Sequence, residues 1–299
     1  MKRLFVSFIT SVWMLVMFVG AVNPALADGS APIAENLELN TYRNVSVSGK
    51  LNAYDPEDDV ERFFITTEPI KGKIKLEQDG SFIYTPDQDK KGKDYFGYKA
   101  IDTEGNCSQE ATVIIRIDKQ KASVSYIDMT ERAGEYASVV LSSSGIFTGE
   151  MLGGQYCFYP DKPVNRGEFY SMCLLASDQP LYKGVLSTGF DDDASIPYWM
   201  KEYAAVAAVQ GLGANGENRF DPEAHLSKAE AAFMLNEVFG FTDVDYLSAK
   251  DEEQSAYAQA CLNLNAVGVL DSFAMTEDEL SREDAAIMLV KAMEKIGNK

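Results

Sequence analysis

Ser227-Lys228-Ala229-Glu230 is a helix start, and the same four-residue pattern occurs at two other places in the second half of the chain. The other copies are Asn165-Arg166-Gly167-Glu168 and Ser281-Arg282-Glu283-Asp284. In each copy the first side chain can accept a hydrogen bond from the free N–H groups of a new helix. The acid three residues later can reach back to the N–H of the cap residue. We therefore predict three helices, capped by Asn165 with Glu168, Ser227 with Glu230, and Ser281 with Asp284.

A cation occupies the first helical position of every copy: Arg166, Lys228 and Arg282. A positive charge there opposes the positive end of the helix dipole, at a cost of a few tenths of a kcal/mol. The three cations follow one another at intervals of 62 and 54 residues. Intervals of this size are typical of repeated helical units. The repetition also suggests that the cations have a role beyond folding.

Other landmarks keep the same order around each capped helix. An aromatic-x-Asp opening comes first, as Tyr126-Ile127-Asp128, Phe190-Asp191-Asp192 and Phe241-Thr242-Asp243. A Gly-aliphatic pair suited to a left-handed helix end follows, as Gly145-Ile146, Gly211-Leu212 and Gly268-Val269. Phe158-Tyr159-Pro160-Asp161 and Phe220-Asp221-Pro222 then precede the first two capped helices.

This order resembles tandem S-layer homology repeats, whose signature is Phe-x-Asp, a His-Trp-Ala helix start, Gly-Ile, Phe-Arg-Pro-Asp and Thr-Arg-Ala-Glu. The three units cover about 124–180, 188–240 and 241–297, and we call them units 1, 2 and 3. The resemblance implies that residues 124–299 form an all-α pseudo-threefold bundle. It also implies three clefts, each presenting a capped helix start.

Proteins of the S-layer homology type hold to secondary cell-wall polymers, commonly through pyruvylated sugars, with this Arg or Lys contacting the acid. The resemblance therefore implies that Arg166, Lys228 and Arg282 bind an anionic glycan, with Trp199 stacking on a sugar. Free N–H groups at helix starts also favour anions. The alternative is that the three cations are solvated residues kept by the repeat.

Units 1 and 3 depart from the signature. They carry Ala133 and Ala256 where the family often has Trp. Unit 3 also lacks a clear Phe-x-Pro-Asp, so Arg282 could line a degenerate cleft.

The N-terminus begins with Met1-Lys2-Arg3, continues with an apolar run from Leu4 to Val22, and reaches Ala25-Leu26-Ala27. This is the anatomy of a secretory signal, so we predict that residues 1–27 are cleaved before Asp28. The run is also long enough to span a bilayer, which leaves an uncleaved anchor as the alternative. Cleavage would give a secreted cell-wall or cell-surface protein without membrane attachment. The formal net charge of −19 argues against nucleic acid as a partner.

Residues 31–118 consist of short alternating runs separated by turn residues. Asp79-Gly80 predicts a hairpin between two of these runs. About seven short strands in this length predict an antiparallel sandwich. The landmarks from Asp55-Pro56-Glu57-Asp58-Asp59 to Asp94-Tyr95-Phe96-Gly97-Tyr98 resemble a bacterial Ig-like or cadherin-like wall module. Residues 119–123 are typical of a linker.

An acidic cluster in this module is the one candidate metal site in the sequence. Asp55, Glu57, Asp58 and Asp59, with Asp102 as a further candidate, could supply hard oxygen ligands to calcium. The alternative is a solvated acidic turn. We expect no other cofactor.

We expect no enzymatic activity from this chain. Its one histidine, His225, excludes paired-His zinc sites, and the sequence contains neither a nucleophile elbow nor a phosphate-binding Gly-rich loop. A Cys157–Cys173 disulfide remains open among the four cysteines.

Two functions remain open. In the first, the helical half anchors the protein non-covalently to the wall and the β half is displayed. In the second, the protein is an adhesin or carbohydrate-binding module whose β-sandwich is the main recognition element.

Overall fold

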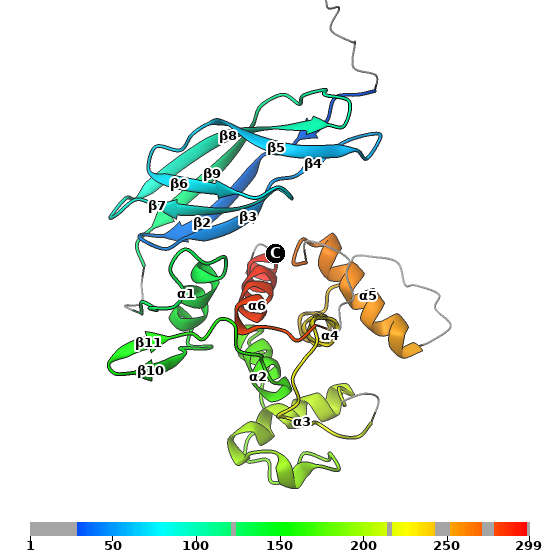
Figure 1. Ribbon diagram of the computed structural model, residues 1–299. Coiled ribbons are helices and arrows are strands. Elements are labelled where there is room, and N and C mark those ends of the chain that lie inside the picture. The colour runs from blue at the N-terminus through cyan, green and yellow to red at the C-terminus, as the bar shows by residue number, and fades with distance from the viewer. Residues whose placement is uncertain (1–28, 121–123, 214–216, 243–251, 271–277, 298–299) are drawn as a thin grey trace, which may run out of the picture.

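The computed structural model describes residues 29–120, 124–213, 217–242, 252–270 and 278–297 (Figure 1). A β module comes first along the chain and a largely helical body follows it. The predicted signal peptide, residues 1–27, lies outside the described residues. No helix in the described part of the chain is long and apolar enough to cross a membrane.

The β module contains nine strands within residues 29–120. They are β1 Ile33–Ala34, β2 Leu37–Tyr42, β3 Val47–Lys50, β4 Ala53–Tyr54, β5 Val60–Thr67, β6 Gly72–Leu76, β7 Ser81–Pro86, β8 Gly92–Asp102 and β9 Ala111–Asp118. One sheet has the order β2-β9-β8-β5 and the other the order β3-β7-β6, while β1 and β4 pair with each other. Alternate side chains of β7 are buried between the sheets, and the rings of Phe82 and Phe96 meet edge-to-face at 5.3 Å.

One ladder of the sandwich corrects the antiparallel prediction. β2 pairs with β9 in parallel, with Leu37 opposite Val113 and Tyr42 opposite Asp118. The rest of the module separates these two strands along the chain, so no tight turn forces them to run in opposite directions. The predicted hairpin between β6 and β7 is present, and Gly80 adopts the left-handed φ of +84° in its turn.

The helical body corrects the all-α prediction by one short hairpin. Its helices are α1 Glu135–Ser143, α2 Arg166–Ala176, α3 Lys201–Gln210, α4 Lys228–Phe239, α5 Glu252–Ala266 and α6 Arg282–Gly297, with the 3-10 turns η1 Asp193–Ser195 and η2 Tyr198–Met200. The hairpin joins β10 Glu150–Leu152 to β11 Gln155–Cys157. Its two-residue turn is Gly153-Gly154, and both glycines have positive φ, as such turns require.

The three Gly-aliphatic pairs end their helices in the same way. Gly145, Gly211 and Gly268 have φ values of +71°, +73° and +73°. The N–H of the aliphatic residue then bonds back to a helix carbonyl: Ile146 to Leu141, Leu212 to Ala207 and Val269 to Leu264, at 2.8–2.9 Å. This is the bonding of a Schellman end, and it occurs once in each unit.

A closed ring of three backbone hydrogen bonds joins the units. Val164 N–H donates to Leu280 C=O (3.0 Å), Leu280 N–H to Leu226 C=O (2.7 Å), and Leu226 N–H to Val164 C=O (3.2 Å). Each of these residues directly precedes a cap residue, and all three are buried. The ring therefore brings the three helix starts to one point in a cyclic order.

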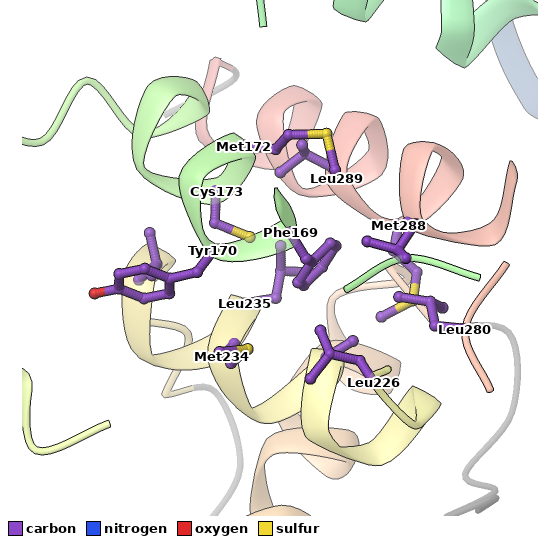
Figure 2. Close-up of a cluster of buried hydrophobic side chains, with 14 of the residues drawn as sticks. Phe169, Tyr170, Met172, Cys173, Leu226, Met234, Leu235, Leu280, Met288 and Leu289 are labelled. Carbon is purple, nitrogen blue, oxygen red and sulfur yellow. The ribbon is translucent and has the colours of Figure 1, made fainter. Parts of the chain in front are cut away.

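The capped helices also share one apolar core. Figure 2 shows Leu226 and Leu280 beside Phe169, with Leu235 of α4 and Leu289 of α6 near them. Cys173 lies in the same cluster, and burial raises the pKa of its thiol. All four cysteines are free, so the Cys157–Cys173 disulfide considered from the sequence is not formed.

The β module and the helical body are in direct contact. Glu135 of α1 accepts a hydrogen bond from the Ser46 N–H (3.1 Å), and Ser48 Oγ donates to the Ala133 carbonyl (2.9 Å). The rings of Tyr42 and Tyr136 lie 5.6 Å apart. Burial raises the pKa of Glu135, which accepts backbone N–H groups from both halves of the protein.

We predict that Leu280→Ala lowers the free energy of unfolding of the helical body by about 2–5 kcal/mol, because it leaves a cavity at the ring. Denaturant unfolding of the full chain measures this change. Leu186→Ala is the matched control, since Leu186 is 79% exposed and its truncation should stay within about 0.5 kcal/mol. Equal losses for the two variants would contradict the assignment of Leu280 to the core.

Candidate functional site

The three helix starts carry the predicted cap bonds. Asn165 Oδ1 accepts from Glu168 N–H (2.8 Å) and Ser281 Oγ from Asp284 N–H (3.1 Å). At Ser227 the capping box is complete, because Ser227 Oγ accepts from Glu230 N–H (3.3 Å) and Glu230 Oε2 from Ser227 N–H (2.9 Å). These bonds leave the cap side chains occupied by the helix.

The helix starts dock on loops of a neighbouring unit. Their first N–H groups donate to loop carbonyls at 2.8–3.2 Å: Arg166 to Ala224, Gly167 to Pro222, Lys228 to Asp278, Arg282 to Lys162 and Glu283 to Pro160. Together with the cap bonds, these contacts use the first three N–H groups of both α2 and α6. An anion at either of those two starts would therefore have to be held by side chains.

The opening acids hold the loops that carry the Phe-x-Pro residues. The two oxygens of Asp128 accept from the Phe158 and Tyr159 N–H groups at 2.9 and 2.8 Å. The two oxygens of Asp192 accept from the Phe220 and Asp221 N–H groups at the same two distances. The third opening acid, Asp243, lies outside the described residues. The openings of units 1 and 2 thus have the same structural role.

Arg166 connects unit 1 to unit 2 from inside the protein. The residue is 4% exposed, and its Nη2 donates to the Leu212 carbonyl at 2.9 Å. Burial lowers the pKa of Arg166 below its ordinary value, although Glu230 opposes the shift. The guanidinium of Arg166 therefore bonds the backbone of the adjoining unit.

Arg282 connects unit 3 to unit 1 in a similar way. The residue is 3% exposed, its Nη1 donates to the Phe158 carbonyl at 2.8 Å, and its guanidinium lies 4.9 Å from the centre of the Phe147 ring. The resemblance led us to expect that Arg166 and Arg282 bind an anionic glycan; in the structure both side chains are buried and each bonds a carbonyl of the next unit. A side chain in the first turn of an isolated helix points to solvent, but here the next unit covers it.

Lys228 differs from the two arginines because its side chain is 42% exposed. Its Nζ lies 2.9 Å from Asp284 Oδ2, and that carboxylate is also well exposed. An exposed pair of this kind contributes only about 0–1 kcal/mol to stability. Lys228 is thus an accessible cation at the junction of units 2 and 3.

Trp199 lies on the surface near the start of α2. The residue is 59% exposed, Tyr198 is 72% exposed, and the rings of Tyr203 and Trp199 meet edge-to-face at 6.4 Å. The next residue, Met200, packs on α2 so closely that a Cβ at Gly167 would lie 2.4 Å from its sulfur. Glycine at this position therefore allows η2 to approach the helix start.

The sequence did not predict a pocket in unit 1 that adjoins unit 3 through Arg132. It measures about 310 Å³ and is lined by Asp128, Arg132, Tyr159, Pro160, Asp161 and Lys162. The guanidinium of Arg132 bonds Asp161 (2.6 Å) and Glu283 (2.5 Å), and the Lys162 side chain is 53% exposed. Ala133 stands at the Trp position of the His-Trp-Ala signature quoted above, so Arg132 stands at the His position. That alignment is the sequence signal from which Arg132 could have been predicted.

The predicted metal ligands are only partly brought together. Among the described residues, Asp55, Asp59 and Asp102 form the carboxylate group that converges, with ligand atoms within 4.8 Å of one another. Glu57 and Asp58 are exposed and do not belong to it. Three of the candidates therefore meet, and two do not.

Comparison with known proteins finds a family match for the β module. Residues 28–119 match the family model of the bacterial cadherin-like domain. This match confirms the cadherin-like resemblance of the β module, and it ends before the helical body. No curated protein matches the chain.

Solved structures are similar over about a third of the chain. An endo-fucoidan hydrolase from glycoside hydrolase family 107 is 19% identical over 31% of this chain and 14% of its own, with a TM-score of 0.26. The SrpA adhesin from Streptococcus sanguinis is 14% identical over 34% of this chain and 68% of its own, with a TM-score of 0.27. The chain thus spans a small part of the first of these proteins.

We predict that Arg282→Ala lowers the free energy of unfolding by at least about 2 kcal/mol, whereas Lys228→Ala changes it by less than about 0.5 kcal/mol. The first variant leaves the buried Phe158 carbonyl without its donor, which costs about 1–3 kcal/mol, and removes the contact with Phe147. The second removes an exposed pair and relieves the helix dipole. Chemical denaturation of the full chain tests both, and similar losses would show that Arg282 is not a structural contact.

Proposed function

We propose that the helical half attaches the protein non-covalently to the bacterial cell wall, as three S-layer homology repeats that bind an anionic secondary cell-wall polymer. The cadherin-like module would then be the part that is displayed or that acts as a spacer. The closed ring of Val164, Leu226 and Leu280 carries this proposal. It supports the reading of three equivalent units whose helix starts meet in cyclic order.

Lys228 and Trp199 are the polymer contacts in this proposal. Lys228 carries three donors on its ammonium, so it can bond a ligand carboxylate and keep Asp284. A pyruvylated sugar offers such a carboxylate, and an exposed indole such as that of Trp199 offers a face on which a sugar ring stacks. A glycan with acidic substituents therefore suits both groups.

Arg166 and Arg282 have a supporting role in this proposal. Both guanidinium groups bond backbone carbonyls of the next unit, so they fix the walls of the junctions. At the junction of units 3 and 1, Arg132 and Lys162 replace Arg282 as the accessible cations. Asp161 and Glu283 both pair with Arg132, so their negative charges offset its positive charge. The attraction of this junction for an anion is therefore weaker than that of an unpaired arginine.

We further propose that the protein is not an enzyme. His225 is an exposed loop residue whose Nδ1 lies 3.0 Å from Glu279 Oε1. The histidine therefore lies beside a carboxylate on the surface. Among the described residues, its side chain forms no hydrogen bond with a Ser, Thr or Cys nucleophile.

The alternative function, an adhesin whose β-sandwich is the recognition element, is favoured by the match to the cadherin-like family. The two proposals differ in which half binds sacculi. Each half has its own apolar core, so residues 29–119 and 124–299 can be produced separately. Wall attachment through the repeats predicts that the second fragment co-sediments with sacculi and the first does not. Equal binding by the β fragment would favour the adhesin.

We predict that Lys228→Ala with Trp199→Ala weakens co-sedimentation of the full chain with sacculi by about tenfold or more, without lowering its melting temperature. A lost hydrogen bond to a charged group is worth about 1.5–3 kcal/mol, which sets this scale. Both residues are changed because other junctions compensate for a single loss through avidity.

Lys75→Ala is the matched control, because it also removes one exposed cation but lies in β6 of the cadherin-like module. It should bind like the parent. Sacculi stripped of their secondary polymer should bind neither the parent nor the Lys75→Ala variant. Parental binding by the double variant would overturn the contact assignment, and equal binding to stripped sacculi would overturn the proposed ligand.

A further inference from the structure

A cleft of about 560 Å³ lies between the cadherin-like module and the helical body, and its volume is typical of ligand-binding clefts. Residues 37–40 of β2 and 47–50 of β3 line one side of it, and residues in and beside α1 and α6 line most of the other. Figure 1 shows β2 and β3 on the side of the module that faces these two helices. Both strands are edge strands, β2 of the four-stranded sheet and β3 of the three-stranded sheet. Two sheet edges therefore border the cleft.

Three of the four edges of these two sheets carry features that hinder pairing with another strand. The ladder of β5 contains two register shifts. β6 presents the exposed Lys73 and Lys75. β3 is four residues long, and its Ser48 bonds the Ala133 carbonyl of the helical body (2.9 Å). Irregular ladders, edge lysines and short or covered edges are the usual protections against unwanted strand pairing.

The edge of β2 has none of these protections. Its six residues, Leu37–Tyr42, include no Lys or Pro and pair with β9 in one continuous register. Among the described residues, no hydrogen bond outside this ladder uses the backbone N–H or C=O of residues 37–40. The backbone groups that point away from β9 are therefore free to pair. β2 thus presents a regular free edge to a sheltered cleft.

Apolar side chains from both halves of the protein line the cleft. They are Leu37, Leu39, Val47, Tyr136, Ile287 and Val290. Val290 is buried, whereas Leu37, Leu39 and Ile287 are half-buried and keep part of their surface in the cleft. An occupant with apolar side chains would cover this surface, which favours its binding.

The charged side chains of the cleft are mainly positive. Three lysines, Lys50, Lys291 and Lys295, line it against two glutamates, Glu38 and Glu294. Glu38 is already paired with Arg116 of β9. The chain as a whole has a formal net charge of −19, so a positive cleft contrasts with the rest of the protein. An acidic occupant would be attracted to the cleft and repelled at long range by the remaining surface.

We propose that β2 binds an extended acidic peptide of a partner protein, which adds to the sheet as a strand inside the cleft. Strand addition satisfies the free backbone groups of β2, while alternate side chains of the added strand meet the apolar surface and the lysines. Two copies of this acidic chain repel each other at long range, which favours a separate partner over a second copy. The inference does not rest on wall attachment, because neither Lys228 nor Trp199 lines the cleft.

The probe is an acetylated and amidated hexapeptide of alternating Asp and Val, which matches β2 in length. Isothermal titration of the full chain at about 0.15 M salt, where attraction between distant charges is screened, should show one peptide per chain. Bound peptide should protect backbone amides of β2 from hydrogen exchange and leave those of β5 and β6 unchanged. A second hexapeptide with Pro in place of the middle Val should bind at least about tenfold more weakly, because proline has no N–H to donate.

Two double variants test the role of the lysines. Lys50→Glu with Lys295→Glu should weaken binding of the Asp-Val peptide by about tenfold or more, because it reverses charges that line the cleft. Both residues are exposed, so the variant should fold like the parent. Lys73→Glu with Lys75→Glu is the matched control, since it makes the same change in net charge on β6, outside the cleft. It should bind the peptide like the parent.

Several results would overturn the proposal. Absence of binding, or protection of β5 or β6 in place of β2, would show that the free edge of β2 is not a strand-binding site. Equal binding of the proline peptide would show attraction to charge without strand addition. Equal weakening by the two double variants would indicate a general electrostatic effect. Self-association of the full chain that the peptide abolishes, measured by sedimentation, would show that a second copy occupies the cleft.

Discussion

The ring formed by Val164, Leu226 and Leu280 is the interaction on which the helical body depends. Each residue precedes a capped helix, so its backbone is extended and its N–H and C=O are free to pair outside the helix. The backbone hydrogen bonds of these three residues can all form only when all three units are present. Removal of any one unit would leave a buried donor and a buried acceptor without partners, which is costly. The units therefore stabilise one another as a single body.

This cyclic docking also determines which cations reach the solvent. Once a helix start lies against the next unit, a guanidinium in its first turn can bond a nearby carbonyl, as Arg166 does with Leu212 and Arg282 does with Phe158. Lys228 pairs with Asp284 on the surface instead. Arginine suits the buried positions because its charge is spread over a planar group that is weakly hydrated. Arg166, Lys228 and Arg282 thus occupy equivalent positions in the sequence but differ in exposure and in bonding partners.

Features of this protein that depend on short-range bonding were predictable from the sequence. The Ser227 cap and the left-handed Gly211 use partners within a few residues. The burial of Arg166 depends on Leu212, which comes from another unit, and the parallel β2–β9 ladder depends on strands at opposite ends of the module. The turn signal of the β10–β11 hairpin, Gly153-Gly154, was present, but the family resemblance predicted only helices there.

The contacts between the two halves lie away from Trp199, one of the proposed polymer contacts. Glu135 and Tyr136 of α1 meet the β module, and Glu294 of α6 bonds the Tyr136 hydroxyl (3.2 Å). These helices belong to units 1 and 3. Trp199 precedes α3, and α3 lies at the far end of the helical body from the β module (Figure 1). In the proposed attachment, binding at Trp199 and display of the cadherin-like module would therefore not compete for the same surface.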